Sequence, residues 1–248
     1  MNVIYILWLR QIKRYLRSRA RIIGSLAQPL LFLVAMGFGF GPTYQKAGGG
    51  NYMEFLAPGI IAMSILFTAL FTGIEIIWDK QFGFLKETLV APVSRLKIMI
   101  GRTLGGGTVS ILQGIIVFII TLFVGFRPAG LFSFLLALVF MFLIALFFTA
   151  LGTAIASFLE DMQGFQLIMN FLVMPIFFLS GAIFPLENFS GVIGIVAKLN
   201  PLSYGVDGLR GGLSGIYNFS LSMDLLVLSV VVVISLAIGT YLFTKIEI

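Results

Sequence analysis

Few side chains in the apolar parts of this 248-residue chain could do chemistry. A carrier driven by protons or ions needs ionisable groups at membrane depth, where such groups are costly unless function retains them. The chain has no His, and the candidate is Glu75, four residues before Asp79 and near the end of an apolar run. We expect Glu75 to be a solvated acid at a helix end rather than a proton relay. Energy for any pumping would then come from outside this chain.

A second candidate is the glycine-rich segment GRTLGGGT, residues 101–108. It lacks the Lys of the G-x-x-x-x-G-K-[ST] loop that cradles nucleotide phosphates, so we do not expect the chain to bind ATP in that way. Small residues four apart, such as Gly101 and Gly105, allow helix backbones to approach closely. We therefore expect helix packing here rather than ligand binding.

Long apolar runs must position these residues. The chain is 59% hydrophobic and 10% charged, against roughly 25% charged residues in an average soluble domain. Unbroken runs of about 20 apolar residues can cross the bilayer as helices and differ from the alternating strands of a barrel. The remaining residues could not cover six such helices in a soluble core. We expect an all-α polytopic membrane protein, one domain over residues 1–248, without Lys, Arg or Asp inside its spans. The six expected transmembrane helices are 22–41, 55–77, 104–125, 131–158, 165–184 and 224–243.

The basic residues predict the orientation of these spans. Twelve of the 16 Lys and Arg residues lie before the first span, between the second and third, or after the sixth. The positive-inside rule therefore predicts a protein of the cell membrane, plasma or inner, with both termini and residues 78–103 in the cytoplasm. This topology explains the net charge of +6 without a nucleic acid as partner.

Residues 1–21 are typical of an amphipathic helix lying on the cytoplasmic leaflet. Aromatic and aliphatic residues fall on one side of this helix, namely Tyr5, Trp8, Leu9, Ile12, Tyr15 and Leu16, and basic residues fall on the other, namely Arg10, Lys13, Arg14 and Arg17. A cleaved signal would place its charges before an apolar core and end in small residues. The alternative is a basic tail that only follows the positive-inside rule. The absence of Cys excludes disulfides in the outer loops.

The polar segment 78–103 is the one long hydrophilic interruption between apolar runs. Apolar residues such as Phe84 and Leu89 lie among charged ones, and Pro92 should end or kink any helix that begins before it. The segment could dock into a groove on a partner protein or rest on lipid. Because residues 98–100 return toward the membrane, these features by themselves favour a passive connector on lipid.

Residues 185–223 are too short and too often broken by Pro and Gly for two more spans. We expect this outer segment to dip into the membrane and return, covered by protein or a water cavity. Asp207 and Arg210, three residues apart, can form an exposed ion pair worth roughly 0.2 to 0.5 kcal/mol. Gln166 and Asn170 share one face of the fifth span, where they could line a cavity. We favour hydrogen bonds between helices, worth roughly 0.6 kcal/mol.

Three stretches of sequence, the last two close together, resemble a known family. FGFLKETLVAPVSR (82–95) and the pair FFLSGAIFPLENF (177–189) and LNPLSYGVDGLRGGL (199–213) are similar to the type-2 ATP-binding-cassette exporter permeases. The resemblance is closest to the daunorubicin-resistance kind. It covers nearly the whole chain, because the surface helix, the six spans and both motifs occur in the family's order.

The resemblance implies a specific role for the polar segment, which reverses the preference for a lipid connector. It implies a cytoplasmic coupling helix that sits in a cleft of an ATPase subunit, formed by Phe82, Gly83, Phe84, Leu85, Lys86, Glu87, Leu89 and Pro92. It also implies outer re-entrant short helices with a gate, for which the candidates are Phe184, Pro185, Asn200, Pro201 and Tyr204.

The resemblance further implies partners and a cargo. The chain would be no enzyme and bind no cofactor, while ATP and Mg would bind to two separate ATPase subunits. A second permease copy or a homologue would complete the pathway, surrounded by membrane lipid. The expected cargo is a drug-like or lipid-like amphiphile moved outward. A lipid-linked glycan is the alternative cargo, and an ATP-independent channel or membrane scaffold is the alternative from another class.

Overall fold

The computed structural model describes residues 2–46, 51–84, 88, 92–159 and 161–244. These residues form helices and no strand, so the predicted all-α class is confirmed for the described part of the chain. The elements are α1 (Val3–Arg17), α2 (Arg19–Lys46), α3 (Tyr52–Phe71), α4 (Ile74–Gln81), α6 (Arg95–Phe123), α7 (Leu131–Phe158), α8 (Met162–Phe178), the short 3-10 helix η1 (Leu186–Asn188), α9 (Gly191–Leu199), α10 (Pro201–Ser214) and α11 (Leu221–Thr244).

Among the described residues, five helical stretches are long and apolar enough to cross a membrane, which supports a multi-pass membrane protein. They are Arg19–Lys46, Tyr52–Gln81, Arg95–Phe123, Leu131–Phe158 and Leu221–Phe243. The run expected at 165–184 forms the 17-residue α8, which is about 26 Å long at 1.5 Å per residue. It ends at Phe178, before a turn in which Gly181 has a φ of +77°. The sixth span therefore stays a prediction.

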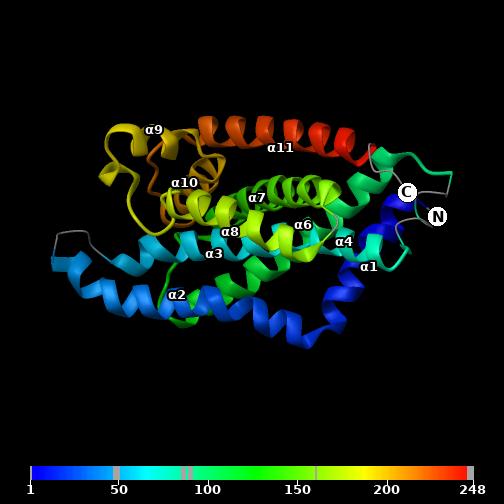
Figure 1. The fold of residues 1–248 in the computed structure, drawn as a ribbon. Coiled ribbons are helices and arrows are strands. Elements are labelled where there is room, and N and C mark those ends of the chain that lie inside the picture. The colour runs from blue at the N-terminus through cyan, green and yellow to red at the C-terminus, as the bar shows by residue number, and fades with distance from the viewer. Residues whose placement is uncertain (1, 47–50, 85–87, 89–91, 160, 245–248) are drawn as a thin grey trace.

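The core of the bundle is α3, whose residues 56–66 are all buried. It packs against α2, α6, α7 and α10. The start of α1 and the end of α11 lie at one end of the bundle together with α4, whereas α9 and α10 lie at the opposite end (Figure 1). The topology thus gathers the N-terminal helix and the helix that precedes the polar segment at the same end.

The N-terminal helix α1 packs against α6 and is only partly available to lipid. Leu7, Gln11 and Tyr15 are buried, and the Tyr15 hydroxyl donates a hydrogen bond to Oε1 of Gln113. The expectation that the aromatic side of this helix lies on the leaflet is therefore wrong for Tyr15, because the glycines of α6 allow this face of α1 to approach closely. Burial also raises the pKa of the Tyr15 phenol.

The two glycines of that contact show how close the helices are. A Cβ on Gly101 would lie 3.0 Å from Cβ of Leu7, and one on Gly105 would lie 2.7 Å from Cγ of Gln11. Because real Cβ atoms almost never lie within 3.0 Å of another heavy atom, a side chain at Gly105 would clash with Gln11 unless the two helices moved apart. The expectation that this glycine-rich segment serves helix packing is confirmed.

Candidate functional site

Two carboxylates one turn apart on α4 organise the end of the bundle that carries α1. Glu75 is only 2% exposed, and its Oε1 accepts a hydrogen bond from Nη1 of Arg21 at 2.6 Å. Nη1 of Arg14 lies 3.6 Å from its Oε2. The expectation of a solvated acid is therefore wrong, because basic side chains from α1 and the start of α2 surround Glu75.

Asp79 forms the second half of this ion network. Its Oδ1 accepts a hydrogen bond from Nη2 of Arg10 at 2.9 Å, and its Oδ2 accepts one from Nη2 of Arg102. Arg10 belongs to α1 and the buried Arg102 to α6, so one carboxylate joins α4 to two neighbouring helices. A buried pair of this kind is strongly destabilised when one partner is removed, because the other charge is left uncompensated.

The next residue, Lys80, ties α4 to the end of α7. Its Nζ donates hydrogen bonds to the carbonyl oxygens of Ser157 at 2.6 Å and Leu159 at 3.1 Å. The last carbonyls of a helix have no partner within the helix, and a cation there also interacts favourably with the helix dipole. Three charged residues therefore fix α4 to α1, α2, α6 and α7.

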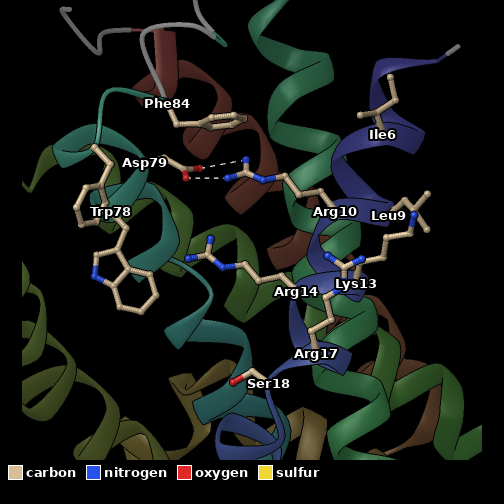
Figure 2. Close-up of a pocket in the computed structure, with 11 residues that line it drawn as sticks. Ile6, Leu9, Arg10, Lys13, Arg14, Arg17, Ser18, Trp78, Asp79 and Phe84 are labelled. Atoms are coloured by element: carbon tan, nitrogen blue, oxygen red, sulfur yellow. Dashed lines mark hydrogen bonds and ion pairs between the residues drawn. The ribbon is translucent and has the colours of Figure 1, made fainter.

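The predicted coupling segment begins directly after this anchored helix. Phe82 is 82% exposed, Gly83 has a φ of +78°, and Phe84 is 38% exposed. The guanidinium carbon of Arg10 lies 3.9 Å from the centre of the Phe84 ring, and Figure 2 shows the Arg10 guanidinium beneath that ring and beside Asp79. Arg10 therefore contacts both the anchored helix and the segment that follows it.

The rest of the predicted coupling segment is described only in part. Leu85, Lys86, Glu87 and Leu89 lie outside the described residues. The hydroxyl of Thr88 donates a hydrogen bond to the Phe84 carbonyl at 3.0 Å, and Pro92 is exposed. The coupling role of this segment stays a prediction.

A basic groove lies between α1 and the end of α4 (Figure 2). Its cavity of about 860 Å³ is lined by Ile6, Leu9, Arg10, Lys13, Arg14, Arg17, Ser18, Trp78, Asp79, Phe82 and Phe84. The lining thus contains four cations and one carboxylate. Within the described part of the chain, the ion pairs engage Arg10 and Arg14 but neither Lys13 nor Arg17.

At the opposite end of the bundle, three of the predicted gate residues hold α10 in place. Asn200 caps α10 by accepting from the Leu202 N–H at 3.0 Å, and its Nδ2 donates to the Ile176 carbonyl at 2.6 Å. Pro201 occupies the first turn of α10, and the Tyr204 hydroxyl donates to the Lys198 carbonyl at 2.7 Å. The structure thus gathers these three residues where α8, α9 and α10 meet.

The other two predicted gate residues lie in the connection between α8 and η1. Phe184 is exposed, and Pro185 caps η1. No hydrogen bond or ring contact between described residues links them to the Asn200 cluster. The gate stays a prediction for all five residues.

The expectation that Asp207 and Arg210 form an exposed ion pair is wrong. Both residues are buried, and Asp207 accepts hydrogen bonds from the backbone N–H groups of Asn218 at 2.9 Å and Phe219 at 2.8 Å. Arg210 donates to the Gly181 carbonyl at 2.8 Å and lies over the Phe55 ring. Each charge therefore fixes α10 to a different neighbour. Burial lowers the pKa of Arg210 to about 10.

The sequence reasoning also missed a buried acid in the last span. Asp224 begins the run 224–243, so the expectation that the spans contain no Asp is wrong. The side chain lies in the first turn of α11, is fully buried, and has no hydrogen-bond partner in the described part of the chain. The sequence did carry a signal for this burial, because Asp224 directly precedes the apolar residues 225–228 (LLVL).

The network around Glu75 and Asp79 was missed as well. Acids four residues apart lie on one face of a helix, so their spacing could have predicted a shared environment. Their arginine partners were not predictable in the same way, because the contacts span up to 69 residues of sequence.

Comparison with known proteins identifies the family of this chain. The sequence profile of the ABC-2 type transporter family matches residues 2–214. The inner membrane transport permease YadH of Escherichia coli strain K12 is 27% identical over 229 residues, which cover 92% of this chain and 89% of YadH. Nodulation protein J of Rhizobium leguminosarum bv. trifolii is 29% identical over 193 residues, or 77% of this chain and 73% of that protein. The ycf38 transport permease of Porphyra purpurea is 31% identical over 200 residues, covering 78% and 68% of the two chains.

Proposed function

Because this chain belongs to the ABC-2 type transporter family, we propose that it is the permease subunit of an exporter driven by ATP hydrolysis in a separate subunit. The cargo is a drug-like or lipid-like amphiphile, with a lipid-linked glycan as the alternative. The observation that carries the proposal is the anchoring of α4 by Glu75, Asp79 and Lys80 directly before the exposed Phe82 and Phe84.

The anchored helix supplies a route for mechanical coupling. A displacement of the Phe82–Pro92 segment acts on α4, and the ion network passes this displacement to α1, α2, α6 and α7. Packed helices of this kind change between discrete arrangements rather than deforming continuously. ATP binding in the partner can bias such an equilibrium only if the two arrangements differ in their contacts with that partner.

The proposal includes an assembly with defined partners. Two ATP-binding-cassette ATPase subunits bind ATP and Mg and receive the Phe82–Pro92 segments of two permease chains. The second permease is another copy or a homologue. Both termini and the coupling segment face the cytoplasm, as the distribution of basic residues predicts.

A change of Phe84 tests the coupling proposal. Phe84→Asp places a charge where an apolar contact with the ATPase is proposed. The rate of ATP hydrolysis stimulated by the transported substrate should therefore fall at least about tenfold, which corresponds to a rise of about 1.4 kcal/mol in the activation free energy. Leu85→Asp should act in the same way. The measurement is ATP hydrolysis and transport in vesicles containing the chain and a coexpressed ATP-binding-cassette ATPase.

The control for this test is Phe84→Leu, which keeps an apolar side chain and should retain coupling. Membrane insertion of all variants should be unchanged. Full coupling in both Asp variants would exclude docking at this segment. If the chain never copurifies with an ATPase, the channel or scaffold alternative replaces the exporter.

A further inference from the structure

The basic groove beside α4 meets a second cavity at Trp78. This second cavity, of about 390 Å³, lies between α2 and the helices α3 and α4 and is lined by Tyr15, Arg21, Gly24, Ser25, Gln28, Pro29, Phe67, Thr68, Phe71, Ile74 and Trp78. The side chain of Trp78 lines both cavities. Both volumes fall within the range of about 300 to 1,000 Å³ that is typical of small-molecule sites.

The two cavities differ in chemical character. The lining of the groove includes Arg10, Lys13, Arg14 and Arg17 but only one acid, Asp79, so its wall carries an excess of three positive charges. The second cavity is lined largely by apolar groups, among them Phe67, Phe71 and Ile74. An amphiphile with an anionic head and an apolar tail matches this sequence of environments.

The charges in the groove are not all used within the protein. Arg10 and Arg14 bind the carboxylates of α4, whereas Lys13 and Arg17 are exposed and form no ion pair among the described residues. Figure 2 shows Arg10 and Arg14 extending from α1 toward Asp79 and Trp78, with Lys13 and Arg17 on the same helix. Lys13 and Arg17 therefore remain available for an external anion such as a phosphate.

We propose that the two cavities form one binding site for an anionic amphiphile, with a phosphate-bearing head held by Lys13 and Arg17 and an acyl chain in the cavity between α2 and α3. This inference rests on the proposed function, because it names the chemical class of the amphiphile that the exporter takes. Trp78 separates the two parts of the site and contacts the ligand where head and tail join.

The two tryptophans of the chain make this site directly testable. Trp8→Phe leaves Trp78 as the sole fluorescent indole, since the chain has two Trp residues. The protein is placed in nanodiscs containing brominated phosphatidylglycerol or brominated phosphatidylcholine at equal mole fractions. We expect the anionic lipid to quench Trp78 more strongly and at lower mole fraction than the zwitterionic lipid.

Changes of charge test the head position. In the Trp8→Phe background, the double change Lys13→Ala and Arg17→Ala should raise the mole fraction of phosphatidylglycerol that gives half-maximal quenching about 25-fold, because each basic residue near anionic lipid contributes a factor of about five. The control Lys97→Ala with Lys198→Ala removes two exposed positive charges elsewhere and should leave quenching unchanged. Equal loss in both double variants would overturn the head position.

Two glycines of the same helix test the tail position. Gly24 lines the second cavity, and a Cβ there would meet nothing within 4 Å, so Gly24→Leu fills space without a clash at Cβ. Gly39 is equally open and lines neither cavity. We expect Gly24→Leu to weaken quenching by phosphatidylglycerol and Gly39→Leu to leave it unchanged. An unchanged Gly24→Leu would overturn the tail position.

Inorganic phosphate distinguishes a lipid from a free anion. Phosphate at an ionic strength matched with chloride should leave most of the quenching by phosphatidylglycerol in place, because the tail contributes to binding. Complete recovery of fluorescence would assign the groove to a free anion and overturn the amphiphile site. No part of this measurement needs an ATPase, so its failure is separable from failure of the exporter proposal.

Discussion

At the residue scale, the contacts of Asp79 determine what its loss would cost. Asp79→Asn removes the negative charge between Arg10 and Arg102, and Arg102 is only 3% exposed. An unpaired charge at such a site lowers the free energy of unfolding by about 3 to 5 kcal/mol. We expect a clear fall in the midpoint of thermal unfolding in detergent, monitored by circular dichroism.

A second substitution shows whether the stranded charge is the cause. The double variant Asp79→Asn and Arg102→Met removes both partners and should unfold at a higher temperature than Asp79→Asn alone, since a buried ion pair can be replaced by apolar groups at little cost. Glu187→Gln changes an exposed acid in η1 and should have no effect. A double variant that unfolds below Asp79→Asn would contradict this account.

Single residues also show where reasoning from sequence is reliable. The spacing of Gly101 and Gly105 predicted close packing because it depends on local geometry alone. Glu75 was predicted to be solvated because its neighbours in sequence place it at a helix end. Its burial depends on Arg14 and Arg21, which approach from helices more than 50 residues away. Pairings of this kind arise from tertiary packing, so they cannot be predicted from the local pattern of the sequence.

At the element scale, α1 is held by its contact with α6. Gly105→Leu would place a side chain where even a Cβ would lie only 2.7 Å from Cγ of Gln11, and overpacking of this kind costs about 1 to 3 kcal/mol. We expect α1 to separate from α6, so that trypsin cleaves at Arg10, Lys13 or Arg14 much faster than in the parent chain. Gly39→Leu, in open space on α2, should show the parent rate.

The fluorescence of Trp8 gives an independent measurement of the same event. Its indole N–H donates a hydrogen bond to Oγ1 of Thr108 on α6 at 3.0 Å. Separation of the helices would break this bond and expose the ring to water or headgroups, so the emission of Trp8 in a Trp78→Phe background should shift in Gly105→Leu. Unchanged emission and an unchanged cleavage rate would show that α1 is held without the close contact at Gly105.

The helical elements differ in how well their sequences predicted them. Long apolar runs predicted α2, α6, α7 and α11 because length and composition are sufficient signals for a span. The segment that forms α10 is rich in glycine and lies within residues 185–223, for which the sequence predicts short pieces broken by Pro and Gly. The glycines of α10 instead allow aromatic rings to pack against the helix, since a Cβ on Gly208 would clash with the Phe140 ring and one on Gly211 with the Tyr217 ring. The sequence does not predict these contacts, because it does not show which rings lie beside α10.

At the scale of the whole molecule, charge separates the two ends of the bundle. The end with α1 and α4 carries the arginine network and the basic groove. The opposite end carries α9 and α10, where the buried Asp207 and Arg210 are bound by backbone groups of neighbouring segments. This asymmetry is the physical basis of the predicted orientation, because basic residues favour the cytoplasmic side of a membrane.

Cysteine labelling tests that orientation directly, since the chain has no native Cys. Lys46 at the end of α2 and Lys97 at the start of α6 are both exposed and lie at opposite ends of the bundle. We expect a membrane-impermeant maleimide added to intact cells to modify Lys46→Cys but not Lys97→Cys, which should react only after the membrane is permeabilised. Modification of both from outside would mean that the two ends do not face opposite sides. Modification of Lys97→Cys alone would invert the topology, and the coupling segment could then no longer reach an ATPase in the cytoplasm.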